Sequence, residues 1–495
     1  MKYKILSVFA SFVLIFTFSC TTKFLDLYPI SSQTTGTFYK TQKDFDQALN
    51  ACYKELQDHY DAYSTTEYIL EAKSDDVMPG PYGSLDIARF LDDATNSTTA
   101  AFWKKSFEVI NTCNQLITYI DGAEEEISDK ETMVAEARFI RGIVYFDMVR
   151  LFGGMPLYDK AYNLDEYYTI ARSSIDETYE FIYSDFQTAA EVLPANYTGA
   201  NVGRATSFAA KGFLGKAYLT NQKYSEALEL FNQITSSPNY GFYNDWLQIW
   251  DEANDNGQQA LFQIQFITGS TNRDQGCQYL TYCAAEGVAI GDLADKKYPL
   301  GGASPSMLVS QDLYDSYEDG DIRRDLTICS EYMTKQNVLN TSTFFVWKFT
   351  HKAIIPSLTE DWGLNRTLLR YTDILMMKAE CINQISGPIS EAVNIVNMVR
   401  TRAGLADLAA EETSSKDSFL QAIVKERRHE FAFENQRWFD LLRWGIAEDV
   451  MNSFLADMEV NVPHEMKSYQ NLYPIPAEQI EIIGDETVLS QNPGY

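Results

Sequence analysis

Leu214-Gly-Lys-Ala-Tyr218, followed by Ala227-Leu-Glu-Leu-Phe231 and Pro238, has the residue sizes and spacing of two helices packed side by side. The small residues Gly215 and Ala227 would let two antiparallel helices approach closely, while the large apolar residues of both segments fill the space between and beyond them. A helix pair of this kind cannot bury its apolar face alone. The stretch therefore predicts a stack of several such pairs.

The spacing is that of the tetratricopeptide repeat without its tryptophan. Weaker copies occur at Ala379, Asn383, Ala392 and Val396 within 369–402, and at Gly142 and Tyr145 within 136–152. Alternating Phe262, Ile264 and Phe266 predict a strand over Ala260–Ile267. The expected fold class is mainly α: a tetratricopeptide-like helical-repeat scaffold with a loop-rich variable half and a few short strands.

One domain is expected over residues 20–495. Its helical-repeat scaffold is placed at 36–72, 101–236 and 366–450, and its variable ligand-binding loops at 74–100 and 239–365. The run Pro79-Gly-Pro-Tyr-Gly83 predicts that Ser74–Ala100 is a long exposed loop. The apolar residues of the irregular C-terminal tail, 473–495, predict that it packs down on the domain.

The N-terminus has the composition of a secretory signal. Two lysines precede the apolar run Ile5–Phe18, which is shorter than the roughly 20 residues that span a bilayer. Cys20 follows a small residue, so we expect a signal peptide over 1–19 and a bacterial lipoprotein lipidated on Cys20. Because Thr17 occupies a position that is usually leucine, an ordinary secreted protein with an unmodified Cys20 is the alternative.

Composition excludes several kinds of function. The net charge of −29 would repel nucleic acid and anionic lipid headgroups. The four histidines show no metal-ligand spacing, and no nucleotide or dinucleotide fingerprint is present, so no metal and no cofactor are expected. The seven cysteines do not form a zinc pattern. A local bridge between Cys277 and Cys283 stays open.

Two acidic clusters could in principle carry chemistry. Glu430 and Glu434 stand four apart on a predicted helix, Ser418–Trp444, and could serve as a glycosidase pair. Nearby arginines would keep both carboxylates ionised, which is wrong for a general acid. We therefore predict a partly buried Arg–Glu network and no enzyme. Asp315–Asp325 fails the EF-hand spacing, and we interpret it as a helix end followed by a salt-bridged turn.

The aromatic loops are the best candidates for a binding site. A flat aromatic side chain can cover the C–H face of a sugar, while Asp, Asn or Arg bond its hydroxyls. The predicted glycan contacts are Asp75, Asp76, Tyr82, Arg89 and Asn96 in one loop, and Tyr279, Tyr282 and Tyr298 in another. With 31 tyrosines in the chain, a structural role is the alternative for any single one.

Several motifs resemble one family nearly end to end. They are Phe24-Leu-Asp26 after Cys20, Ala135-Glu-Ala-Arg-Phe-Ile-Arg-Gly142, Leu151-Phe-Gly-Gly-Met-Pro156, Leu369-Arg-Tyr-Thr-Asp-Ile-Leu375, Arg427-x2-Glu430-Phe-Ala-Phe-Glu434, Arg437-Trp-Phe-Asp440, Tyr473-Pro-Ile-Pro476 and Asn492-Pro-Gly-Tyr495. With these motifs the chain resembles the SusD/RagB family of outer-membrane nutrient-binding lipoproteins of Bacteroidetes-type bacteria.

The resemblance implies a tetratricopeptide scaffold, exposure on the cell outer membrane through a lipid anchor, and glycan binding without catalysis. It also implies delivery of captured oligo- or polysaccharide to a SusC-like TonB-dependent transporter. The shared motifs belong to the scaffold, so the ligand residues rest on chemistry and on position within 74–103 and 275–300. The alternatives are a tetratricopeptide-type protein-binding scaffold without glycan binding, and a glycoside hydrolase that uses Glu430 and Glu434.

Overall fold

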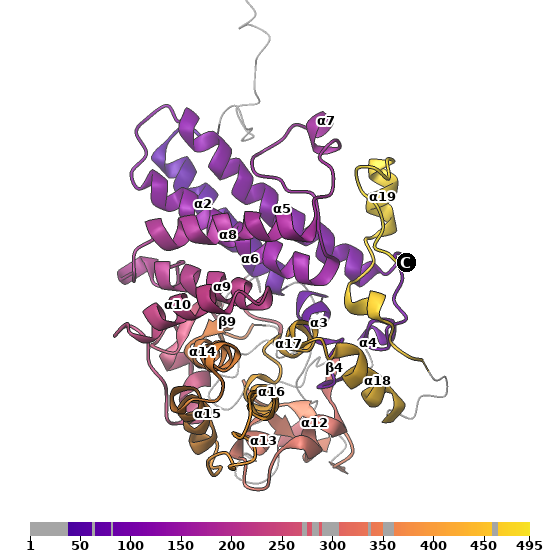
Figure 1. The fold of residues 1–495 in the computed structure, drawn as a ribbon. Helices are drawn as coiled ribbons and strands as arrows, with labels where there is room; N and C mark the ends of the chain where they lie inside the picture. The colour runs from indigo at the N-terminus through magenta and orange to yellow at the C-terminus, as the bar shows by residue number, and fades with distance from the viewer. Residues whose placement is uncertain are drawn as a thin grey trace, which may run out of the picture.

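The computed structural model describes residues 38–61, 65–80, 83–269, 275–279, 287–289, 306–334, 338–349, 361–457 and 464–495. The predicted signal peptide and Cys20 lie outside these residues. Long helices form a layered stack along one side of the molecule, and shorter helices and strands form the other side (Figure 1).

The stack is built from antiparallel helix pairs. They are α2 (Gln42–Asp61) with α5 (Ser97–Tyr119), α6 (Lys130–Phe152) with α8 (Ile175–Val192), α9 (Ser207–Thr220) with α10 (Tyr224–Thr235), and α14 (Tyr371–Ser386) with α15 (Ser390–Arg402). Successive pairs also pack on one another, α5 on α6, α8 on α9 and α10 on α14. The predicted repeat architecture is confirmed.

Small residues set the spacing within these pairs. A β-carbon at Gly215 of α9 would lie 2.6 Å from the ring of Phe231 on α10, whose side chain is fully buried. A β-carbon at Gly142 of α6 would lie 2.9 Å from the ring of Phe186 on α8. Both glycines are therefore required by the close approach of an aromatic ring, as the repeat pattern predicts.

The predicted strand at 260–267 is confirmed but shorter. It is β2 (Ala260–Ile264), which pairs antiparallel with β9 (Arg366–Arg370). Leu261 and Gln263 are buried as well as Phe262 and Ile264, because the strand also packs against α9. The β2–β9 pair therefore packs against both the third and the fourth helix pairs, and β2 does not present one face to water.

The other side of the molecule contains short elements. Its helices are α3 (Thr65–Glu71), α4 (Leu85–Ala88), α7 (Leu164–Tyr167), α12 (Gln311–Ser316), α13 (Ile322–Thr327), α16 (Lys416–Phe431), α17 (Arg437–Trp444), α18 (Ala447–Asp457) and α19 (Ala477–Ile483). Its strand pairs, all antiparallel, are β1 (Val77–Pro79) with β4 (Met307–Val309), β5 (Ile328–Cys329) with β8 (Phe345–Val346), and β6 (Tyr332–Thr334) with both β3 (Gly287–Ala289) and β7 (Leu339–Asn340).

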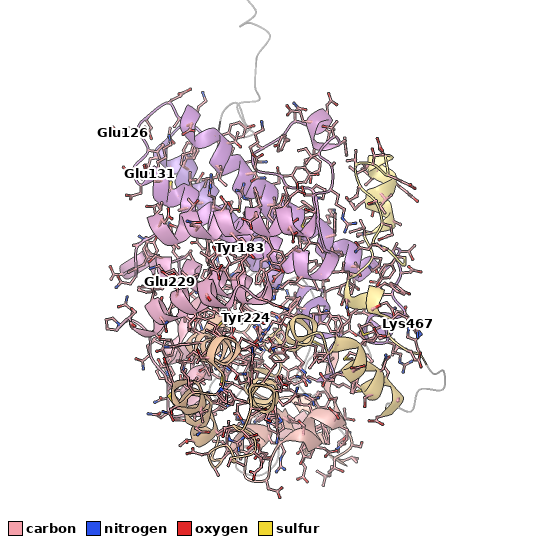
Figure 2. All side chains as sticks on the ribbon, viewed as in Figure 1. Glu126, Glu131, Tyr183, Tyr224, Glu229 and Lys467 are labelled. Atoms are coloured by element: carbon pink, nitrogen blue, oxygen red, sulfur yellow. The ribbon has the colours of Figure 1, made fainter. Side chains whose placement is uncertain are left out.

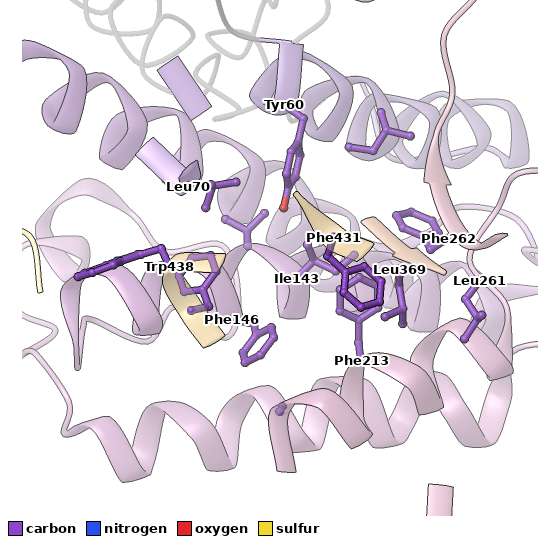
Figure 3. Close-up of a cluster of buried hydrophobic side chains, with 14 of the residues drawn as sticks. Tyr60, Leu70, Ile143, Phe146, Phe213, Leu261, Phe262, Leu369, Phe431 and Trp438 are labelled. Atoms are coloured by element: carbon purple, nitrogen blue, oxygen red, sulfur yellow. The ribbon is translucent and has the colours of Figure 1, made fainter. Parts of the chain in front are cut away.

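One apolar core runs from the helix stack into this second side. Figure 3 shows Tyr60 of α2 and Phe146 of α6 in the same cluster as Phe213 of α9 and Phe431 of α16. Trp438 of α17 lies at the edge of the cluster and is fully buried. The two sides therefore fold around shared side chains.

The predicted helix Ser418–Trp444 is wrong as a single element. Helix α16 ends at Phe431 and α17 begins at Arg437, with left-handed backbone at Phe433 and Asn435 (φ of 63° and 58°) between them. The break frees carbonyl groups that the buried Lys348 ammonium binds, at 2.8 Å for the carbonyl of Glu430 and 3.0 Å for that of Ala432.

Ser74–Ala100 also differs from the predicted exposed loop. It contains β1, α4 and the beginning of α5, and its first residues, Ser74 to Asp76, are buried. Tyr473 and Ile475 of the C-terminal tail are fully buried, as predicted. Figure 2 shows Glu126, Glu131 and Glu229 along the outer edge of the helix stack, where all three are exposed. None of the helices in the described ranges is long and apolar enough to cross a membrane.

Candidate functional site

A surface groove of about 410 Å³ lies where β1, β4, α12 and α18 meet. We call it the β1–β4 groove. Its lining residues are Met78, Leu308, Val309, Gln311, Asp312, Ser342, Thr343, Phe344, Phe454 and Asp457. The volume falls in the range of about 300–1,000 Å³ that is typical of small-molecule sites. The groove combines apolar surface with carboxylate, amide and hydroxyl groups.

Phe344 is the half-buried aromatic ring of this groove. It stacks on Tyr314, with ring centroids 4.7 Å apart and an interplanar angle of 30°. The preceding turn is fixed because Asn340 Oδ1 accepts hydrogen bonds from the backbone N–H groups of Ser342 and Thr343, at 2.9 and 3.2 Å. An aromatic platform and two hydroxyl side chains are therefore held next to each other.

Strand pairing brings the two predicted loop regions to this groove. Pro79 at the end of β1 lies opposite Met307 at the beginning of β4. Beyond the strands the Gly80 N–H donates to the carbonyl of Ser306 at 2.9 Å. A β-carbon at Gly83 would lie 2.2 Å from that same carbonyl oxygen, so only glycine fits there.

Asp75 and Asp76 lie behind the groove rather than in it. Asp75 binds the Arg437 guanidinium with both oxygens, at 2.7 and 2.8 Å. Arg428 binds Asp76 at 2.7 Å and reaches Asp312 of the groove at 2.6 Å. The aspartates are 2 % and 0 % exposed, which argues against direct sugar contacts. Their role in this geometry is to hold Arg428, which positions Asp312.

The pKa shifts of the two aspartates follow from their surroundings. Burial would raise the pKa of Asp75, but Arg437 and Arg428 outweigh it and leave the pKa below its usual range. Burial dominates at Asp76 and raises its pKa, although Arg428 opposes the shift. Asp75 is therefore more strongly stabilised as an anion than Asp76.

Of the other predicted contacts that the structure describes, Asn96 and Tyr279 have internal partners. Asn96 caps α5, accepting from the backbone N–H groups of Thr98 and Thr99 at 3.0 and 3.2 Å. Arg89 ends α4, and its half-buried side chain has no hydrogen bond at Nε among the described residues.

Tyr279 is 5 % exposed and donates to the carbonyl of Phe433 at 3.2 Å. The Arg366 guanidinium lies 3.6 Å from its ring centroid. Tyr82, Tyr282 and Tyr298 lie outside the described residues. Sugar contact by these three tyrosines and by Arg89 stays a prediction. Cys277 is a buried free thiol, and Cys283 is also outside the described residues.

None of the residues that line the groove was among the predicted glycan contacts, and the turn before β8 supplies three of them, Ser342, Thr343 and Phe344. Asn340-Thr-Ser-Thr-Phe344 places an Asx-type turn directly before an aromatic residue. That local signal was visible in the sequence. Its proximity to β1 and α18 was not, because those elements are more than 100 residues away in the chain.

The predicted Arg–Glu network is confirmed, with different arginines. Arg370 binds Glu430 at 2.8 Å and Glu434 at 2.6 Å. Arg323 binds Glu430 at 3.2 Å, Arg402 also binds Glu430, and Lys348 binds Glu434 at 2.6 Å. The sequence had suggested the arginines of the same segment, yet Arg427 binds Asp373 and Asp440 instead. Neither glutamate lines the β1–β4 groove.

The lowered pKa of Glu430 predicts how the stability of the fold depends on pH. Burial alone would raise its pKa, but Arg402, Arg370 and Arg323 outweigh burial and lower the pKa to about 2. A carboxylate with a lowered folded-state pKa stabilises the fold above its unfolded pKa and loses that contribution as pH falls. We expect the free energy of unfolding to drop between about pH 4.5 and pH 2, with Glu430 contributing about 3 kcal/mol.

Urea unfolding of the wild type and of Glu430→Gln at a series of pH values checks this expectation. We expect the variant to be less stable at neutral pH, because the ion pairs of Glu430 are lost, but its free energy of unfolding should fall less steeply below pH 4.5. Equal steepness in the two proteins would contradict the assignment of this titration to Glu430.

Asp315–Asp325 is a helix end followed by a salt-bridged turn, as predicted. Helix α12 ends at Ser316, Asp321 caps α13, and Arg323 binds Asp321 at 2.7 Å. In the part of the chain that the structure describes, no group of three or more His, Cys, Asp or Glu residues could hold a metal ion.

Stacked helix pairs that carry a loop-rich half with a surface groove define a helical-repeat binding protein. The chain belongs to the SusD/RagB family. The family model described as "SusD family" matches residues 327–495, and the model described as "Starch-binding associating with outer membrane" matches residues 23–219.

Relatives match over nearly the full length. SusD-like protein P2 of Formosa agariphila is 26% identical over 503 residues, covering 95% of this chain and 96% of that protein. A SusD-like protein of Bacteroides ovatus is 26% identical over 478 residues, covering 90% of this chain and 83% of that protein.

Solved structures share the fold. A SusD superfamily protein from Bacteroides vulgatus has a TM-score of 0.75 at 22% identity, covering 93% of this chain and 100% of that chain. Surface glycan-binding protein A from Bacteroides thetaiotaomicron, in complex with laminarihexaose, has a TM-score of 0.73 at 22% identity, covering 91% of this chain and 99% of that chain.

Proposed function

We propose that this chain is a non-enzymatic cell-surface lipoprotein that captures an oligo- or polysaccharide in the β1–β4 groove. It is anchored in the outer membrane through Cys20 and delivers the glycan to a SusC-like TonB-dependent transporter. The main support for this proposal is the groove, in which the Phe344 ring lies beside hydroxyl, amide and carboxylate side chains. Family membership and the glycan complex of a structural neighbour support the proposal.

The chemistry of the groove fits a sugar. Sugar rings present apolar C–H faces that pack on aromatic rings, and their hydroxyls both donate and accept hydrogen bonds. Gln311, Ser342 and Thr343 can donate or accept, whereas Asp312 and Asp457 accept. Glu430 and Glu434 are unsuited to hydrolysis because arginines bind them inside the protein. Tethering beside a transporter would raise the effective concentration of captured glycan.

Affinity electrophoresis in gels that contain a single polysaccharide each (laminarin, starch, xylan or mannan) tests the proposal. We expect one class to retard the wild type without release of reducing ends. Phe344→Ala should weaken that binding about tenfold, since a large apolar contact is lost. Asp457→Ala, at an exposed rim position, should weaken it less.

Tyr469→Ala is the matched control, because Tyr469 is 40% exposed and lies outside the groove. Its mobility should equal that of the wild type. Retardation of Phe344→Ala equal to that of the wild type would contradict the assignment of the glycan site to the β1–β4 groove. If no polysaccharide retards the wild type while the chain still co-purifies a protein partner, the protein-binding scaffold becomes the better account.

A further inference from the structure

A second groove lies between α5, α7 and α19, and we call it the tyrosine groove. Its volume is about 420 Å³. Tyr162, Tyr167 and Tyr168 line it together with Phe107 of α5 and Ile482 of α19. Figure 1 shows α7 and α19 on the same side of the molecule as α12 and α18 but at the opposite end. No lining residue is shared with the β1–β4 groove.

One ring in this groove is held flat before any ligand arrives. Tyr167 lies parallel to the buried Tyr158, with centroids 4.0 Å apart and an interplanar angle of 8°. Tyr158 covers one face of the Tyr167 ring, and Tyr167 is itself only half-buried. Tyr168 stands at 88° to Tyr167 and is 37% exposed. A flat ring beside a perpendicular one forms a corner for a ligand with an apolar face.

The groove also contains polar side chains that are free to bind. Lys104 and Asn111 of α5 and Gln479 of α19 line it, and none of the three side chains makes a hydrogen bond or ion pair within the described residues. The two amides each offer a donor and an acceptor, and the ammonium offers donors. The hydroxyl groups of a sugar both donate and accept hydrogen bonds, so they can pair with the two amides and the ammonium while an apolar face of the sugar ring lies on Tyr167.

We propose that the tyrosine groove is a second oligosaccharide-binding site, with Tyr167 as its stacking platform and Asn111 and Gln479 as its hydroxyl-binding side chains. The proposal rests on the proposed function, because it assumes that the physiological ligand is a glycan. Two separate sites on one tethered protein would hold a long chain more tightly than either site alone.

Isothermal titration with a panel of hexasaccharides (laminarihexaose, maltohexaose, cellohexaose, xylohexaose and mannohexaose) tests the proposal. At least one of them should bind the wild type with a stoichiometry of two. Tyr167→Ala and Asn111→Ala should each reduce the stoichiometry to one or weaken one site about tenfold. Phe344→Ala should weaken the other site about tenfold, and its combination with Tyr167→Ala should weaken both sites. Asn111 is exposed, so its variant keeps the test valid if Tyr167→Ala fails to fold.

Each alternative outcome has a separate meaning. A wild-type stoichiometry of one, with binding that is weakened by Phe344→Ala and unchanged by Tyr167→Ala, overturns the second site and keeps the proposed function. Absence of binding by the whole panel overturns the second site, and the polysaccharide gels then decide the proposed function independently. If Tyr167→Ala binds sugar as the wild type does but no longer co-purifies with a transporter from detergent, the second sugar site is overturned. The tyrosine groove is then a protein-docking surface. Tyr469→Ala is the control for an exposed tyrosine.

Discussion

Replacing Arg370 with alanine is expected to lower the free energy of unfolding by about 3–5 kcal/mol. Arg370 is 1 % exposed and makes four hydrogen bonds, three to carboxylate oxygens of Glu430 and Glu434 and one to the carbonyl of Glu430. Without the guanidinium, two carboxylates remain in the interior with less compensation. Breaking one partner of a buried ion pair is costly because the remaining charge has lost its hydration as well as its partner.

Urea unfolding of Arg370→Ala at neutral pH measures the loss of unfolding free energy. The stability of Arg370→Lys should lie between that of Arg370→Ala and that of the wild type, because lysine keeps the positive charge but cannot make the paired hydrogen bonds of a guanidinium. Arg324→Ala is the matched control. Arg324 pairs with Asp325 at 2.9 Å on the surface, where ion pairs contribute about 0–1 kcal/mol. A loss below about 1 kcal/mol for Arg370→Ala would mean that Arg323, Arg402 and Lys348 suffice without it.

Gly154→Ala is the second substitution with a large expected effect. A β-carbon at Gly154 would lie 2.0 Å from the carbonyl oxygen of Ser173 and 2.8 Å from the carbonyl carbon of Ser174. These are backbone atoms at the beginning of α8, and Ser173 N–H also donates to the Met155 carbonyl at 3.0 Å. Relief of the clash requires α8 to move away from α6, so we expect a loss of about 3 kcal/mol or more.

Gly122→Ala is the matched control for Gly154→Ala, because a β-carbon at Gly122 would meet nothing within 4 Å. Its free energy of unfolding should stay within about 0.5 kcal/mol of the wild type. Thermal and urea unfolding of both variants measure the difference. Equal stability of the two variants would show that the α6–α8 junction can yield, and would contradict the close-packing explanation.

The helix pairs could be predicted because their information is local. Gly215 and Phe231 lie within one repeat, so residue size and spacing already indicate which face of α9 meets α10. The Asp315–Asp325 turn could be interpreted for the same reason: Asp321 and Arg323 are two residues apart. The break between α16 and α17 escaped prediction, since Lys348, which binds the carbonyls freed there, is distant in the chain.

The site was harder to predict than the scaffold. Asp75, Asp76 and Asn96 are residue types that bind sugars, but the same types form buried ion pairs and helix caps. Residue type alone does not separate these roles, because exposure decides between them. Phe344 was missed because its loop reaches β1 and β4 only in the folded chain.

The amino-acid sequence was enough to predict the repeat scaffold, the likeness to the SusD/RagB family and an Arg–Glu network around Glu430 and Glu434. These depend on periodicity, motif order and the chemistry of neighbouring residues. The folded structure was needed to show which arginines bind Glu430, where Asp75 and Asp76 lie, and that β1 meets β4 to form a groove. Buried charges and grooves are completed by segments far apart in the chain, and their proximity is set by packing rather than by local spacing.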